Sequence, residues 1–405
     1  MNVFEFSGEE HATELPSSVS RTAIPMTSVE AVLESGALVI DLRSPSEFAL
    51  DHLPNAISIP LFGDDERALV GTLYKQQSPE EAFSEAREIA RGRIRSMVLE
   101  ISESSNWQPP DDDFESRLTK MTEGGVILLE GELFGESLDS ITKDHVVLHC
   151  WRGGLRSRSV VAFLNALGLD KAVLLEGGYK QYRRVVLSQL KQATFPRAFV
   201  LRGLTGVGKS LVLRELEQLR PGWAIDLELL AGHRSSILGM VGLEPCNQKT
   251  FDSRLASQLR IGLSEVVVYE GESRKVGDTI LPASLWASLS SGTDIEVTAP
   301  IDYRVDVLID DYLDAPENRT ELRKQLPFIE NRLGKNKWTG VLVDLLDNGG
   351  ERELVELLLE HYYDPLYSHS HKQHTFGQSI DSTDPRRAAE SIIEWIESEL
   401  GRSAP

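Results

Sequence analysis

Cysteine is scarce in this chain of 405 residues, which contains only Cys150 and Cys246. Two thiols are too few for a disulfide framework, and this scarcity favours a reducing compartment. No apolar run approaches the roughly 18–20 residues that a membrane span needs. The N-terminal stretch MNVFEFSGEEHATELP is acidic and has no basic region followed by an apolar core, so it is unlike a signal peptide. These absences predict a cytoplasmic protein without a membrane segment.

Positive charge is also in short supply, because 42 Lys and Arg residues face 63 Asp and Glu residues and leave a net charge of −21. Nucleic acids are bound mainly through Lys and Arg, so this balance lowers the expectation of a nucleic-acid partner. A net charge is a sum, however, and an acidic protein can still carry a local basic face. The hydrophobic fraction of 41% and the charged fraction of 26% are those of a globular protein.

The first half of the chain alternates short apolar runs with helical patterns, which is typical of a parallel α/β sheet. Residues 78–100 begin with Ser, Pro and two glutamates, and this start predicts a capped helix. Strands are predicted in this half at residues 37–41, 56–59, 126–130, 145–149 and 172–175.

The alternation restarts near residue 195, where we place a domain boundary. An apolar run at 198–201 precedes a glycine loop and a helical pattern at 211–219, and an amphipathic helix is expected at 385–400. Further strands are predicted at residues 223–226, 266–270 and 294–298. The length of the chain fits two or three domains of this kind.

Cys150 follows the apolar run HVVLH and precedes WRGGLRSRS, which enters a helical pattern. A loop in this position can direct backbone N–H groups at an anion, and Arg152, Arg156 and Arg158 would favour the thiolate. A lone cysteine is more often buried and inert, and Cys246 is interpreted in that way. The glycine pair and the three arginines instead favour a nucleophile at Cys150. The predicted anion-binding residues of its loop are Arg152, Gly153, Gly154, Arg156 and Ser157.

Segments in order around this thiol resemble the rhodanese domain. They are Asp41-Leu-Arg-Ser-Pro-Ser-Glu-Phe, then His52-Leu-Pro-Asn-Ala, then Cys150-Trp-Arg-Gly-Gly-Leu-Arg-Ser, then Leu175-Glu-Gly-Gly-Tyr-Lys. The resemblance implies that Cys150 carries the chemistry, as in the persulfides of rhodaneses, and that Asp41 and Arg43 support its loop.

The same resemblance implies a rhodanese-like domain at residues 25–195, after a lead segment at 1–24. A long insertion at about 61–144 departs from a minimal rhodanese domain and suggests an added substrate surface.

Gly203-Leu-Thr-Gly-Val-Gly-Lys-Ser fits the phosphate-loop pattern G-x-x-x-x-G-K-[ST] between a predicted strand and a predicted helix. Glycines let the backbone wrap around phosphate oxygens, and the start of the helix adds a partial positive charge. Lys209 would hold a terminal phosphate, and Ser210 would ligate Mg²⁺ if a metal takes part. The predicted phosphate-binding residues are Gly203, Thr205, Gly206, Gly208, Lys209 and Ser210.

Two acids end later strands of this second domain, Asp226 after WAI and Glu270 after VVVY. Either residue can direct a metal ion or merely cap the end of its strand, and both interpretations stay open. No adenine pocket is evident, so the phosphorylated ligand need not be ATP. The residues expected at this edge of the phosphate loop are Asp226, His233, Arg234, Glu270, Glu272 and Arg274.

A rhodanese-like domain ahead of a P-loop domain resembles the tRNA 2-selenouridine synthase family over roughly residues 25–375. Three linked segments strengthen this resemblance: Asp64-Asp-Glu-Arg-Ala-Leu-Val, Asp226-Leu-Glu and Glu270-Gly-Glu-Ser-Arg. The chain departs from the family pattern in having a longer spacer before Cys150. The implied fold is α/β, with a rhodanese-like parallel-sheet domain followed by a P-loop NTPase-like domain at 196–405 that ends in a helical segment.

The family resemblance also implies a reaction, in which selenium replaces sulfur in wobble 2-thiouridine of tRNA. Selenophosphate and geranyl diphosphate are the implied co-substrates, with geranylation of the sulfur as the first step. The P-loop would then hold a diphosphate or selenophosphate, and Cys150 would act in the substitution at C2. No firmly bound cofactor is implied, and Mg²⁺ at Ser210 is the one candidate metal.

Contacts to tRNA are expected where arginines gather. Arg87, Arg91 and Arg95 share one helix face at i, i+4 and i+8, and Arg183 and Arg184 form a second group. The alternative for the first group is a solvated face paired with neighbouring glutamates.

Two other functions remain compatible with the motifs. One is a rhodanese-type sulfurtransferase coupled to a P-loop domain that uses ATP. The other is a non-enzymatic module that senses anions or redox state.

Overall fold

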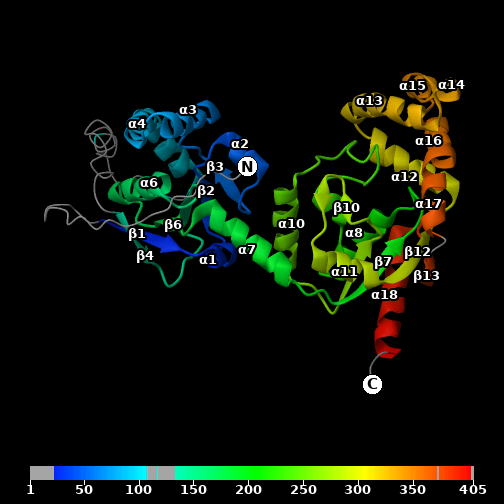
Figure 1. Cartoon of the computed structure of the whole chain (residues 1–405). Helices are drawn as coiled ribbons and strands as arrows, with labels where there is room; N and C mark the ends of the chain where they lie inside the picture. Colours follow the sequence, from blue (N-terminus) through cyan, green and yellow to red (C-terminus); the bar gives the residue numbers. More distant parts are fainter. Residues whose placement is uncertain (1–21, 106, 108–115, 117–132, 372–373, 403–405) are drawn as a thin grey trace. The chain divides into compact units, whose positions relative to one another are not determined.

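The computed structural model describes residues 22–105, 107, 116, 133–371 and 374–402. The chain forms two compact units, Met1–Val185 and Val186–Pro405 (Figure 1), and each is described by itself. In the part of the chain that the structure describes, no helix has the length and apolar character needed to cross a membrane. The strand expected at 126–130 lies outside the described residues.

A six-stranded parallel sheet in the order β3-β2-β5-β6-β1-β4 forms the centre of the first unit. The buried strands β2 and β5 pair in register, which sets Asp41 beside His149 at their carboxyl ends. The strands are β1 (Thr22–Thr27), β2 (Leu38–Asp41), β3 (Ala56–Ser58), β4 (Leu133–Ser137), β5 (Val146–His149) and β6 (Ala172–Leu175).

The predicted helix at 78–100 is confirmed as α4 (Pro79–Ser104), where Ser78 caps the first turn by accepting a hydrogen bond from the Glu81 amide at 3.1 Å. One face of α4 packs Ile94, Met97 and Ile101 onto the core of the sheet. The other helices of this unit are α1 (Val29–Ser35), α2 (Pro45–Leu50), α3 (Asp64–Gln76), α6 (Leu155–Ala166) and α7 (Gly178–Gln192), which continues into the second unit.

The described part of the insertion at about 61–144 is built into the sheet and its covering helices. Its described part supplies α3, α4 and the edge strand β4, which pairs with β1 in parallel. Neither β1 nor β4 is predicted from the sequence, because their short stretches lack a continuous apolar run.

A five-stranded parallel sheet in the order β13-β12-β7-β9-β8 forms the centre of the second unit. Helix α8 (Lys209–Leu219) follows β7 directly, and α18 (Pro385–Arg402) confirms the expected C-terminal helix. Ile392 and Ile396 of α18 are buried with residues of α8 and β7, so this segment completes the core. The strands are β7 (Arg197–Arg202), β8 (Ala224–Ile225), β9 (Val266–Glu270), β12 (Thr293–Thr298) and β13 (Phe376–Asp381).

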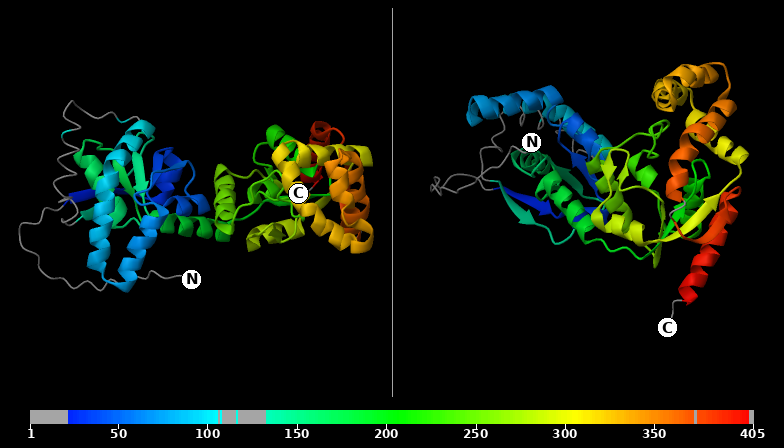
Figure 2. Two further views of the ribbon diagram at one scale, coloured as in Figure 1. Left: turned by 90° about the horizontal axis from the view of Figure 1, so that it is seen from above. Right: turned by 45° about the vertical axis from the view of Figure 1, so that its right-hand side comes forward.

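Between β12 and β13 the chain forms a group of helices, residues 301–371, which we call the helical subdomain and which Figure 2 shows in yellow and orange. Its core buries residues such as Leu308, Tyr312 and Tyr363 in a hydrophobic cluster of its own. Its elements are α12 (Ile301–Leu313), α13 (Pro316–Leu333), α14 (Lys335–Trp338), α15 (Val341–Asp347), α16 (Glu351–Leu358), the π-helical turn η2 (Leu359–Tyr363) and α17 (Asp364–His371).

Smaller elements complete the second unit near the expected edge of the phosphate loop. They are α9 (Leu227–Ala231), α10 (Gln248–Ile261), the hairpin of β10 (Lys275–Val276) and β11 (Thr279–Ile280), and α11 (Ala283–Ser291).

Candidate functional site

The loop that carries Cys150 leaves β5 and enters α6 at Gly154, as the strand, loop and helix pattern predicts. Gly153 has φ = +64°, and a Cβ there would lie 2.8 Å from the Leu175 carbonyl oxygen, so glycine is required. The Tyr179 amide at the start of α7 donates to the Cys150 carbonyl at 3.0 Å. The loop is therefore held from both sides, by α6 and by α7.

Cys150 is 3% exposed, and its sulfur accepts a hydrogen bond from the Ser157 hydroxyl at 3.1 Å. Burial raises the pKa of this thiol, but the charge of Arg156 and hydrogen bonds from Ser157 and the Arg152 amide lower it below its ordinary value. Because the thiolate is the nucleophilic form, this loop favours nucleophilic chemistry at Cys150. Of the predicted loop residues, Arg156 and Ser157 have the most direct effect on the sulfur.

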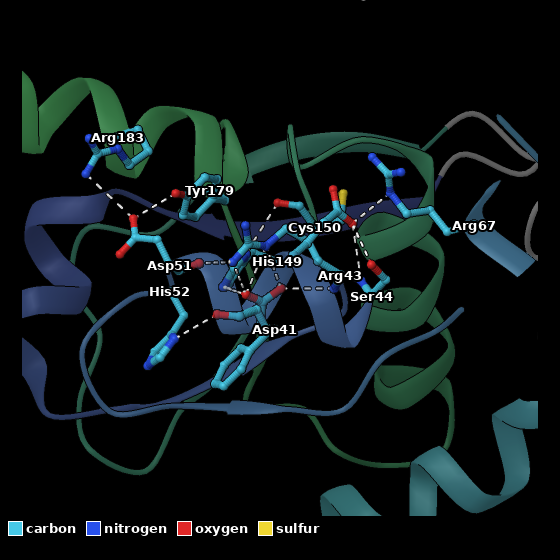
Figure 3. A network of polar contacts seen from close by, with 12 residues as sticks. Asp41, Arg43, Ser44, Asp51, His52, Arg67, His149, Cys150, Tyr179 and Arg183 are labelled. Atoms are coloured by element: carbon cyan, nitrogen blue, oxygen red, sulfur yellow. Dashed lines mark hydrogen bonds and ion pairs between the residues drawn. The ribbon is translucent and has the colours of Figure 1, made fainter. Parts of the chain in front are cut away.

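Asp41 and Arg43 form a buried ion pair beneath the loop, with Arg43 Nη2 2.6 Å from Asp41 Oδ2 (Figure 3). The guanidinium also lies 3.7 Å from the centre of the Tyr179 ring, and the Tyr179 amide bonds to Cys150. Burial would raise the pKa of Asp41, but His149 and Arg43 outweigh it and hold that pKa below its usual range. The pair thus supports the loop through Tyr179, which the sequence did not single out.

Arg183 of α7 points toward the buried carboxylate of Asp51, with Nη1 3.6 Å from Oδ2, as Figure 3 shows. Its side chain is only 13% exposed, and Tyr179 donates to the same carboxylate at 2.7 Å. These contacts anchor α7 to the segment that directly follows α2. The neighbouring Arg184 is exposed and bonds to Gln181 at 3.4 Å.

The face of α4 proposed for tRNA contains arginines in three different settings. Arg87 stacks on the Phe83 ring at 5.0 Å, Arg91 pairs with Glu88 at 3.2 Å, and Arg95 is exposed. The pairing of Arg91 fits the alternative of a solvated face, while Arg95 is the arginine of this group most accessible to a partner.

All six predicted phosphate-binding residues line one cavity of about 170 Å³ in the second unit. Gly206 and Gly208 have φ values of +82° and +79°, which glycine adopts without strain. Lys209 Nζ donates to the Gly203 and Leu204 carbonyls at 3.2 and 3.4 Å. The ammonium group is thereby held across the mouth of the loop where a phosphate would sit.

Only some of the six residues expected at the edge of the phosphate loop lie together at the cavity. Asp226, Arg234 and Glu272 line the cavity, and Glu270 accepts a hydrogen bond from the Ser210 hydroxyl. The other two expected residues, His233 and Arg274, are outside the set that lines it.

Asp226 also accepts from the Leu229 amide at 2.7 Å, so it is a helix cap as well as a cavity residue. Glu270 is fully buried, and its Oε2 has no hydrogen-bond partner. The sequence left open whether Asp226 and Glu270 direct a metal ion or act as caps. Of these two acids, only Asp226 serves as a cap.

Carboxylates crowd the phosphate loop beside Ser210. Burial and the nearby Glu272 raise the pKa of Glu228 to about 8, and burial and Glu228 raise the pKa of Glu270 well above its usual value. Glu228 therefore holds its proton near neutral pH unless a cation displaces it.

Magnesium at Ser210 stays a prediction. Ser210, Glu228 and Glu270 supply oxygen ligands of the kind that Mg²⁺ prefers, with Ser210 Oγ 3.5 Å from Glu228 Oε2. Within the described residues, no group of three or more His, Cys, Asp or Glu side chains is already arranged to hold a metal ion.

Several residues that line the cavity or hold its phosphate loop were missed from the sequence. Arg214 lies one turn after Ser210 on α8, a spacing that could have revealed it, and Glu228 lies two residues after Asp226. Arg304 donates to the Thr205 carbonyl at 2.8 Å and pairs with Asp364 at 2.5 Å, yet no local signal marks it.

Comparison with known families and proteins agrees with this two-part architecture. Residues 26–184 match the family model of the rhodanese-like domain, and residues 196–401 match that of the tRNA 2-selenouridine synthase AAA domain. The predicted fold, a rhodanese-like domain followed by a P-loop-like α/β domain, is thereby confirmed.

Curated proteins named tRNA 2-selenouridine synthase are similar along most of their length. The protein from Nitrosomonas europaea is 29% identical over 390 residues, which cover 85% of this chain and 91% of the relative. The protein from Bdellovibrio bacteriovorus is 27% identical and covers 81% of this chain and 87% of its own. The protein from Shewanella woodyi is 25% identical and covers 94% of this chain and 99% of its own.

Proposed function

The chain belongs to the tRNA 2-selenouridine synthase family, and from this premise we propose that it replaces sulfur by selenium in wobble 2-thiouridine of tRNA. Membership makes the chain a tRNA-modifying enzyme. We further propose that geranyl diphosphate first alkylates the sulfur and that selenophosphate then supplies the selenium.

The composition of the P-loop cavity carries the geranyl diphosphate part of the proposal. The cavity offers the glycine loop and Lys209 to phosphate oxygens, and its lining also includes apolar and aromatic side chains such as Leu243, Leu308 and Tyr312. A prenyl diphosphate combines the same two features, an anionic head and a hydrocarbon tail. Burial of such a tail against leucine and tyrosine rings is favourable.

In the first step, the C–O bond of geranyl diphosphate breaks and its electron pair leaves with the diphosphate. The sulfur of 2-thiouridine forms the new S–C bond, and the base loses its N3 proton. Lys209 and the N–H groups at the start of α8 lower the barrier by neutralising the charge that develops on the departing diphosphate.

In the second step, the selenium of selenophosphate attacks C2, and the C–S bond breaks to release geranyl thiol. Water then breaks the Se–P bond, so that phosphate leaves and 2-selenouridine remains. We assign this step to the Cys150 loop, whose amides, Arg156 and Ser157 stabilise an anion at the sulfur. The same environment would stabilise the anionic selenophosphate bound beside the cysteine.

The test is incubation of the full chain with 2-thiouridine tRNA, geranyl diphosphate and selenophosphate, followed by mass spectrometry of the nucleosides. We expect both S-geranyl-2-thiouridine and 2-selenouridine. Lys209→Ala should abolish geranylation, whereas Cys150→Ser should abolish selenation of tRNA geranylated beforehand. Cys246→Ser is the matched control and should behave as the wild type. Absence of both products with the wild-type protein would overturn the proposal.

The P-loop motif itself favours one rival, a sulfurtransferase coupled to ATP. That rival predicts ATP hydrolysis and a persulfide at Cys150 without any change to tRNA. A non-enzymatic sensing role predicts instead that Cys150→Ser leaves function intact. The same set of variants, assayed for ATP turnover and for modified nucleosides, separates these outcomes.

A further inference from the structure

Helix α12 of the helical subdomain packs directly against the phosphate loop. Arg304 donates to the Thr205 carbonyl, and a Cβ at Gly206 would lie 3.1 Å from Leu308 Cγ. Leu308 and Tyr312 follow Arg304 at i+4 and i+8, so the three residues share one face of the helix. At 1.5 Å per residue, Tyr312 lies about 12 Å from Arg304 along the helix axis. This face forms an apolar wall that leads away from the phosphates.

Two aromatic rings stand at the end of that wall. Tyr312 and Tyr363 are 5% and 2% exposed, and both line the cavity that contains the phosphate loop. Tyr363 comes from the π-helical turn η2, and such turns occur frequently at functional sites.

A second void lies within the core of the helical subdomain and shares its lining with the first cavity. Leu308, Tyr312 and Tyr363 line both, while the remaining lining of the void is leucine and valine, as at Leu354 and Leu358. The void measures about 10 Å³, which is at the lower limit for a single water molecule. The two tyrosines therefore separate the phosphate cavity from a dry, apolar core.

We propose that Tyr312 and Tyr363 form a floor that sets the length of the prenyl chain the enzyme accepts. This inference rests on the proposed function, because its occupant is the hydrocarbon tail of a prenyl diphosphate whose head lies on the phosphate loop. The tail follows the apolar face of α12 and ends against the two rings. A geranyl tail fits in front of them, whereas the additional isoprene unit of a farnesyl tail meets the rings.

The physical reason for selectivity is steric. A packed core does not yield to a longer chain, because inserting extra carbons forces side chains away from their preferred rotamers. Removing one ring would join the cavity to the void and make room for one more isoprene unit. The hydrocarbon would then bury its added surface against the leucines beyond, which favours binding.

The experiment compares the kcat/KM of prenyl transfer to 2-thiouridine tRNA from dimethylallyl, geranyl and farnesyl diphosphates. With Tyr363→Ala, we expect the ratio of farnesyl to geranyl transfer to rise about tenfold or more, with dimethylallyl transfer little changed. Tyr363→Phe preserves the ring and should preserve the ratio. Because truncation leaves a cavity in the core, Tyr363→Leu and Tyr312→Leu serve as milder variants if the alanine variant does not fold.

Leu354→Ala is the matched control, since it enlarges the void behind the rings without removing them. Its ratio should equal that of the wild type, and an equal increase in this variant would overturn the inference. A wild-type protein that geranylates tRNA, together with an unchanged ratio in the folded tyrosine variants, would also overturn it. A wild-type protein that transfers no prenyl group would instead overturn the proposed function.

Discussion

The thiol of Cys150 owes its character to residues within a short distance along the chain. Arg156 and Ser157 belong to the first turn of α6, and the Arg152 amide belongs to the loop itself. Their combined effect exceeds the cost of burying a thiolate, so the pKa falls. Cys246 has a different setting, in which its sulfur donates to the Leu230 carbonyl at 3.3 Å.

The pKa of Cys150 can be measured by the pH dependence of its alkylation with iodoacetamide, with both cysteines followed by peptide mass spectrometry. The midpoint for Cys150 should lie below the ordinary thiol value of about 8.5. Arg156→Gln removes a positive charge that stabilises the thiolate, so the midpoint should move to higher pH. The midpoint for Cys246 in the same sample is the internal control. A Cys150 midpoint that stays in place in this variant would contradict the assigned role of Arg156.

At the scale of secondary structure, the shape of the phosphate loop depends on how closely β7, α8 and α12 approach one another. Gly206 is the point of closest approach, because a Cβ there would lie 2.8 Å from the Arg304 carbonyl oxygen. Its φ of +82° adds a second requirement for glycine. The loop is therefore shaped by α12 as well as by its own sequence.

Gly206→Ala should strain this turn, lowering the free energy of unfolding of the second unit by about 1–3 kcal/mol. We also expect the affinity for inorganic diphosphate to fall, because the loop amides would no longer converge. Urea denaturation and titration calorimetry measure the two effects.

Gly71→Ala is the matched control for that variant. Gly71 lies within α3, and a Cβ there would meet nothing within 4 Å. Alanine should therefore stabilise the helix by about 0.5–1 kcal/mol and leave diphosphate binding unchanged. Equal losses of affinity in both variants would rule out a local role for Gly206.

For the whole molecule, the net charge of −21 means that tRNA must be attracted by a local surface. The arginines of α4 differ in their availability, since Arg87 stacks on Phe83 and Arg93 donates to the Pro60 carbonyl. Arg91 and Arg95 are more accessible, with the Arg91 side chain 38% exposed. These two are therefore the arginines of α4 to test.

The double variant Arg91→Glu and Arg95→Glu should weaken tRNA binding and reduce the salt dependence of the affinity. If both residues contact phosphates, the slope of log K against log salt should become shallower by about 1.4–1.8. Filter binding across a series of salt concentrations provides the measurement.

The matched double variant is Arg220→Glu and Arg386→Glu, which makes the same change in net charge. Both side chains are similarly exposed, at 46% and 52%, and each pairs with a glutamate as Arg91 does. This control should leave the slope unchanged. An equal loss of affinity in the two double variants would point to general repulsion and remove α4 from the tRNA site.

The amino-acid sequence by itself determined the local features of this protein. The strand, loop and helix around Cys150, the phosphate loop and the capped start of α4 were all predicted, because each depends on residues close together in the chain. Glycines at positive φ, helix starts and apolar periodicity leave such signals. The linked motifs around them also identified the family.

Only the tertiary structure decided which distant residues complete the two sites. Arg43 reaches Tyr179, Arg304 reaches Thr205, and Tyr363 lines the phosphate cavity. The sequence pointed to Arg43 and Thr205, but it did not identify Arg304, Tyr363 or the distant partners that these residues contact. Their roles arise from contacts between segments roughly 100 or more residues apart, and no local pattern records such contacts.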